Sequence, residues 1–151
     1  MVGESIVVLD RYLETTVPDP GMRLPLTADQ RCVLRGRRST LCGCDVLLQL
    51  PRDGVLCPGD QLSDAASSVV VEVVAASESL LKVCASSPLD LLQAAYHLGN
   101  RHVALELHPH HLFMLADSVL ETMLRGRGLS ITHCDQPFHP EGGAYKAHHH
   151  P

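Results

Sequence analysis

The sequence predicts a mixed β and α+β fold. It combines a small all-β domain over residues 1–76, a ferredoxin-like βαββαβ domain over residues 77–141, and a flexible histidine-containing tail over residues 142–151. Short apolar runs separated by turn residues fill the first half of the chain. In the second half, helix-start signals followed by apolar residues at helical spacing appear twice. All ten histidines lie after Tyr96, so the two halves differ in chemistry as well as in pattern.

Composition excludes several classes of function. The 151-residue chain is 45% hydrophobic and 19% charged, which is typical of a folded globular protein. Its net charge of -5 and its 3% aromatic content disfavour an RNA-binding module, which needs a basic surface and stacking rings. The start, MVGESIVVLDRYLE, is acidic and no apolar run is long enough to span a bilayer. We therefore expect a cytoplasmic protein that binds neither nucleic acid nor membrane.

The elements of the first half are predicted strands. The runs VLLQL (residues 46–50) and VVVEVV (residues 69–74) are apolar and largely β-branched, and turn clusters such as PDPG, CGCD, PRDG and CPGD separate such runs. Six cysteines occur without a CxxC pair, so a ribbon-type or finger-type zinc site is not expected. Cys42 and Cys44 could chelate a soft metal, but a hairpin or strand position is favoured for them.

The second half begins with a predicted strand at residues 80–85 and a helix. Ser87 is the expected N-cap, Pro88 occupies the first helical position and Asp90 approximates a capping box. Apolar residues then repeat at helical spacing, namely Leu89, Leu92, Ala95 and Tyr96. Gly99 is predicted to supply the left-handed residue that ends this helix.

Two strands, a second helix and a last strand complete the predicted order. Residues 103–107 and 112–115 are expected to pair across an HPHH turn at residues 108–111. Asp117 is the expected N-cap of the second helix, which Gly126 and Gly128 end before a strand at residues 129–132.

The stretch YHLGNRH, residues 96–102, contains the first two histidines. His97 falls in the last helical turn, where an imidazole is favoured by the helix dipole, so a structural role is preferred over a ligand role. His102 lies beyond the helix and should be accessible. One imidazole makes a poor metal site, but two-fold symmetry could bring in a second copy.

Further histidines could complete such a site. The chain ends KAHHHP, with His148, His149 and His150. The alternatives are a purification-tag remnant and a native metal-binding tail, and the non-standard triplet favours the tail. For His108, His110 and His111 an exposed hairpin turn is preferred over a site. His133 and His139 are expected to be ordinary surface or packing residues.

These residues carry a family resemblance over essentially the whole chain. The segments LPLTADQR, LPRDGVLCPGDQL, AAYHLGNRH, DSVLETML followed by GL, and PFHPEGGAY resemble urease accessory nickel chaperones of the UreE type. The resemblance implies a soluble homodimer whose first domain is of a peptide-binding type. It also implies nickel at the interface of the second domains, with His102 as the interfacial ligand and His148, His149 or His150 as tail ligands.

The resemblance further implies a partner and a function. The recipient would be the urease accessory GTPase of the UreG type, and through the activation complex the urease metallocentre; no enzymatic activity is expected. Some members carry histidines beside the aspartate of the second helix, where this chain has Ala116 and Ser118, so any auxiliary site there should be absent.

Two alternatives concern the metal. The first is a general zinc-binding or copper-binding protein, or a buffer, without a role in urease assembly, because histidine ligands also bind zinc and copper in vitro. The second, a metal hydrolase, lacks an HxxxH or HExxH helix.

Overall fold

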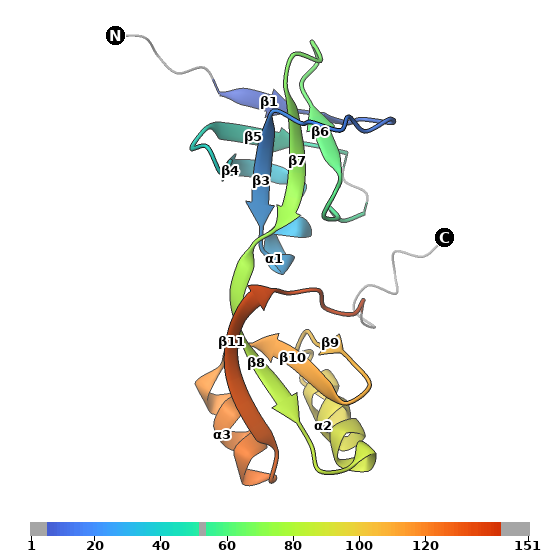
Figure 1. The fold of residues 1–151 in the computed structure, drawn as a ribbon, viewed down its shortest axis with the longest axis vertical. Coiled ribbons are helices and arrows are strands. Elements are labelled where there is room, and N and C mark those ends of the chain that lie inside the picture. Colours follow the sequence, from blue (N-terminus) through green and yellow to red (C-terminus); the bar gives the residue numbers. More distant parts are fainter. Residues whose placement is uncertain (1–5, 52–53, 143–151) are drawn as a thin grey trace. The chain divides into compact units, whose positions relative to one another are not determined.

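The structure is a computed structural model that describes residues 6–51 and 54–142. The chain divides into two compact units, and the boundary along the sequence lies between Ala76 and Ser77. The described residues form three sheets and three helices (Figure 1). No helix in these residues has the length and apolar character needed to cross a bilayer.

The first unit contains two of the sheets. Their strands are β1 (Val7–Leu9), β2 (Arg11–Tyr12), β3 (Met22–Leu26), β4 (Arg35–Ser39), β5 (Asp45–Gln49), β6 (Gln61–Ser63) and β7 (Val70–Ala75). One sheet has the order β1-β5-β4 and the other has the order β2-β6-β7-β3. The two strands expected from the apolar runs at residues 46–50 and 69–74 are β5 and β7, each shifted by one residue.

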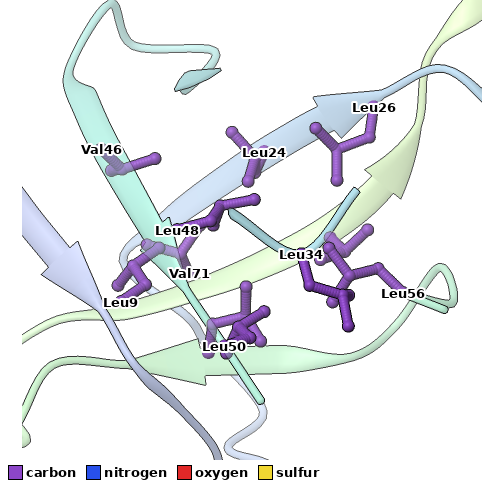
Figure 2. Close-up of a cluster of buried hydrophobic side chains, with 11 residues drawn as sticks. Leu9, Leu24, Leu26, Leu34, Val46, Leu48, Leu50, Leu56 and Val71 are labelled. Atoms are coloured by element: carbon purple, nitrogen blue, oxygen red, sulfur yellow. The ribbon is translucent and has the colours of Figure 1, made fainter. Parts of the chain in front are cut away.

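The core of the first unit lies where the two sheets contribute leucines and valines to one cluster. Figure 2 shows this cluster, with Leu9 and Leu48 from the three-stranded sheet beside Leu24 and Val71 from the four-stranded sheet. These side chains are fully buried. Burying a side chain of this size contributes about 1.5–3 kcal/mol, so the cluster accounts for much of this unit's stability.

The prediction that the first unit is all-β was wrong in one place. Helix α1 (Ala28–Arg31) is a single turn that follows β3. Thr27 caps it, because the Thr27 hydroxyl accepts from the Gln30 N–H and the Gln30 side chain accepts from the Thr27 N–H. This reciprocal capping box was visible in the sequence as TADQ.

The second unit follows the order β–α–β–β–α–β. Its elements are β8 (Ser77–Cys84), α2 (Pro88–Asn100), β9 (Glu106–Leu107), β10 (His111–Leu115), α3 (Ser118–Gly126) and β11 (Ser130–Pro137). The antiparallel sheet has the order β11-β8-β10-β9 (Figure 1). Leu98 of α2 and Leu124 of α3 pack in the same apolar cluster as Leu81 of β8. Both helices are therefore held on the sheet by one core.

The predicted helix starts are confirmed. The Ser87 side chain accepts from the Asp90 N–H, and Pro88 is the first residue of α2. The Asp117 side chain accepts from the Leu120 N–H at the start of α3. The strand expected at residues 103–107 is shorter than predicted, because only Glu106 and Leu107 pair with β10.

The predicted end of α2 was wrong. Gly99 remains within the helix, and the residue with a left-handed backbone is His102, with φ of 60°. Gly128, by contrast, has φ of 87° just beyond α3, where a glycine stop was expected.

A pair of glycine substitutions tests this difference. A Cβ added at Gly99 would meet no atom within 4 Å, and its φ is not left-handed. We expect Gly99→Ala to leave the free energy of unfolding unchanged or to raise it by up to about 1 kcal/mol, because alanine favours helix. Gly128→Ala should lower it by about 1–2 kcal/mol, because alanine resists the left-handed conformation. Urea denaturation at fixed protein concentration measures both, and a large loss at Gly99 would contradict the helical end described here.

Candidate metal centre

His102 is positioned by the way α2 ends. The Val103 N–H donates to the Leu98 carbonyl at 3.1 Å, and the His102 N–H donates to the Gly99 carbonyl at 2.9 Å. These bonds close the last turn and satisfy carbonyls that a helix end leaves open. Leu98 itself is fully buried. The backbone of His102 is thus fixed relative to the sheet, only four residues from a core side chain.

The left-handed conformation of His102 is costly. For a residue with a Cβ it costs about 1–2 kcal/mol relative to the right-handed region. Among the residues that the structure describes, Ser67 is the only other non-glycine with a positive φ. Backbone strain of this kind is most often kept where the side chain has a role.

The His102 side chain is exposed. Within residues 6–51 and 54–142, no hydrogen bond or ion pair engages its imidazole. An imidazole without a competing partner can offer a nitrogen lone pair to a metal ion.

His102 borders an open depression of about 620 Å³ in the second unit. The depression is lined by the end of α2, the segment that leads to β9, and the last described residues, namely Ala95, Gly99, Asn100, His102, Val103, Ala104, Leu105, Leu107, Glu141 and Gly142. The Glu141 N–H donates to the Leu105 carbonyl at 2.7 Å, so the chain after β11 returns to the segment beside His102. The depression therefore joins two segments separated by more than thirty positions in the sequence.

The other predicted ligands are not brought to His102 by the described residues. His148, His149 and His150 lie outside them. His97 is half-buried in the last turn of α2, where its ring meets the Tyr96 ring edge-on with centroids 5.5 Å apart. His97 is not among the residues that line the depression.

One face of α2 is apolar and exposed. Leu89, Leu92 and Tyr96 are 61%, 67% and 66% exposed, and we call these three residues the α2 stripe. These residues belong to the apolar repeat noted in the sequence, but the buried residues of α2 are Ala94 and Leu98. Counting onward along the helix, the face of the stripe reaches Gly99 and Asn100, which line the depression.

The histidines between β9 and β10 form a local cluster. The His108 Nε2 lies 2.6 Å from the Glu106 Oε2, and the His108 and His111 rings stack with centroids 4.7 Å apart. The Glu106 Oε1 accepts from the His139 N–H at 2.8 Å. Partial burial, helped by the nearby Lys82 ammonium, lowers the pKa of His111. In the described residues no three histidine, cysteine, aspartate or glutamate side chains converge as a metal site.

His133 also has a carboxylate partner. Its Nε2 lies 2.9 Å from the Glu121 Oε1, and Arg125 meets the same carboxylate at 3.0 Å. Hydrogen bonds from His133 and then from Arg125 lower the pKa of Glu121. Unlike His108 and His133, His102 has no carboxylate partner among the residues that the structure describes.

Sequence reasoning missed two features of this site. The left-handed backbone of His102 was assigned to Gly99 instead, because glycine is the usual residue there. The second feature is that Glu141 and Gly142 line the same depression as His102. Nothing in the sequence predicted this apart from the PFHPEGGAY motif.

The chain is similar to known proteins over almost its whole length. A family model described as the C-terminal domain of the UreE urease accessory protein matches residues 78–151. A urease accessory protein UreE from Parasynechococcus marenigrum is 60% identical over 97% of this chain and 98% of the relative. The protein of that name from Synechococcus sp. (strain CC9311) is 62% identical over 97% of both chains. One from Thermosynechococcus vestitus is 53% identical over 84% of this chain and 88% of the relative.

This similarity spans both units of the chain at an identity that establishes common descent. The chain belongs to the UreE family of urease accessory proteins.

Proposed function

We propose that this protein carries nickel for urease assembly in the cytoplasm. Two copies associate through their second units, and one nickel ion binds between two His102 side chains with tail histidines completing the ligand set. The observation that carries the proposal is the placement of His102, which is exposed, without a partner in the described residues, and held in a strained backbone beside the depression. As a UreE protein the chain is an accessory chaperone and not an enzyme.

The α2 stripe supports the homodimer. Three large apolar side chains exposed on one helix face are poorly solvated, and covering them with a second copy removes that surface from water. In a two-fold interface the same patch meets itself. Because the stripe leads along α2 toward the depression, an axis near its end brings the two His102 residues together.

The geometry of the chain end supports the tail ligands. The described residues end at Gly142, which lines the depression together with His102. His148 lies six positions beyond Gly142, and an extended chain of that length spans at most about 20 Å. His148, His149 and His150 are therefore within reach of His102.

The family and the βαββαβ order together support the finer assignments. We infer that residues 77–141 form a ferredoxin-like metal-binding domain and residues 142–151 a flexible tail. Residues 1–76 would be a peptide-binding domain. The recipient of nickel would be the urease accessory GTPase within the urease activation complex.

Imidazole chemistry leaves room for a second candidate function. Neutral imidazoles bind zinc and copper as well as nickel, and copper more tightly than either. A general metal-binding or buffering role would use the same His102 site. Urease activation by the nickel-loaded protein separates the two functions, since a buffer would not activate urease beyond an equal amount of free nickel.

Substitution of His102 tests the proposed site. We expect wild type to bind its tightest nickel ion once per dimer, and His102→Ala to lose this event in calorimetric titration. His102→Gly should lose it too while keeping or raising stability, because glycine accepts the left-handed backbone without strain. His97→Ala is the matched control and should retain the event. Tight binding by His102→Gly would show that the ligands lie elsewhere.

Shortening the chain tests the contribution of the tail. A chain that ends at Ala147 should still bind one nickel ion per dimer but at least tenfold more weakly, because each lost imidazole ligand removes binding free energy. Calorimetry on the two chains at equal pH measures the ratio. Unchanged affinity would remove the tail histidines from the site.

A charge in the α2 stripe tests the dimer. Leu92→Glu should convert the protein to a monomer in light scattering and reduce nickel affinity, because a carboxylate opposes burial of the stripe. Val119→Glu is the control, since Val119 is 74% exposed on α3 and outside the stripe. If both variants remain dimers with wild-type affinity, the dimer uses another surface.

A further inference from the structure

The hairpin between β4 and β5 brings two cysteine thiols together. These strands are antiparallel, and the turn is closed by the Thr40 N–H, which donates to the Cys44 carbonyl at 2.9 Å (Figure 1). The Gly43 N–H donates to the Thr40 carbonyl at 3.0 Å, and Gly43 has a left-handed φ of 88°. The turn therefore has a defined shape that brings Cys42 back over Cys44.

The two sulfurs are in contact. The Cys42 Sγ lies 3.6 Å from the Cys44 Sγ and 3.1 Å from the Thr40 Oγ1. Both cysteines are exposed, so a small molecule can reach them. No disulfide joins any of the six cysteines, all of which lie in the described part of the chain.

The surroundings favour the thiolate of Cys42. Hydrogen-bond contacts of the Cys42 sulfur with the Thr40 hydroxyl and then with the Cys44 side chain and backbone lower the pKa of Cys42. A thiolate is the form that attacks disulfides, so Cys42 is the nucleophile of the pair. Arg37 and Arg38 lie at the end of β4 next to the turn, where their two positive charges exceed the single negative charge of Asp45 and favour an anionic reactant.

Metal binding by Cys42 and Cys44 is less well supported than thiol–disulfide exchange. No third histidine, cysteine, aspartate or glutamate among the described residues joins the two thiols in a ligand cluster. The carboxylate of Asp45 is engaged by Ser39 at 3.0 Å and by Arg37 at 3.5 Å. Two sulfurs in contact without further ligands suit exchange with a disulfide better than they suit a divalent ion.

We propose that Cys42 and Cys44 form a dithiol–disulfide exchange site for anionic low-molecular-mass disulfides. The Cys42 thiolate attacks one sulfur of the small disulfide, whose S–S bond breaks as a mixed disulfide forms and one thiolate leaves. Cys44 loses its proton to water and attacks the Cys42 Sγ, which closes the Cys42–Cys44 disulfide and expels the second thiolate. Two electrons pass from the protein to the small disulfide, and the two protons end on the released thiols.

The exchange should be readily reversible. A disulfide closed over a single intervening residue makes a tight ring, and strained disulfides are more easily reduced than structural ones. The site is thus suited to repeated oxidation and reduction in a cytosol that keeps most thiols reduced.

Oxidised glutathione is the probe that tests the proposal on the full chain. Wild type should lose two alkylatable thiols and about 2 Da in mass, with the disulfide mapped to the peptide that contains Cys42 and Cys44. Cys44→Ser should instead keep a mixed disulfide of about +305 Da on Cys42, because no second thiol can displace it. Cys57→Ser, which changes another exposed cysteine, should behave like wild type.

The Thr40 hydroxyl gives an independent readout. Thr40→Val should slow iodoacetamide alkylation of Cys42 severalfold at neutral pH, and Thr40→Ser should restore it. Two outcomes would overturn the proposal: glutathione adding to Cys57 or Cys32 as fast as to Cys42, or wild type keeping a stable adduct as Cys44→Ser does.

Discussion

The candidate centre depends on the hydrogen bond that ends α2, between the Val103 N–H and the Leu98 carbonyl. Leu98 is buried in the core that holds both helices to the sheet, so this bond ties the chain after the helix to the buried core of the second unit. To make it, the backbone must turn through a left-handed residue. In this protein that residue is His102, where glycine would fit without strain. The fold therefore tolerates backbone strain at His102, and the imidazole is attached to the chain at a fixed position beyond α2.

His108 and His133 differ from His102 in their contacts with carboxylates among the described residues. His108 is held by Glu106 and His133 by Glu121, and both carboxylates also hold a second donor. In each of these contacts a ring nitrogen of the histidine is already engaged by a carboxylate oxygen and is not open to a metal ion. In the described part of the chain no carboxylate engages the His102 ring, so its nitrogens are accessible. Those two contacts hold His108 and His133 to neighbouring carboxylates, whereas the exposed ring of His102 fits the proposed binding role.

Local rules predicted much of the fold, and long-range contacts account for the rest. Ser87 and Asp117 were identified as N-caps because capping depends on a few neighbouring residues. The buried face of α2 could not be predicted in this way. Leu89 and Leu92 form one apolar series and Ala94 and Leu98 another, and only packing decides which series is buried. The depression beside His102 could not be predicted from pattern, because it forms where Glu141 returns to Leu105 across the sheet.

The proposed interface links metal binding to association. If nickel binds only where two His102 residues meet, it binds the dimer and not the monomer, so each ion bound stabilises the dimer by mass action. The α2 stripe is small, with three exposed apolar residues, and by itself would give a modest interface. A modest interface is useful to a carrier, because removal of the ion by a recipient then also weakens the contact that held its ligands together. In this proposal, release of nickel and dissociation of the dimer are one equilibrium, which depends on the α2 stripe and on His102 just beyond the helix.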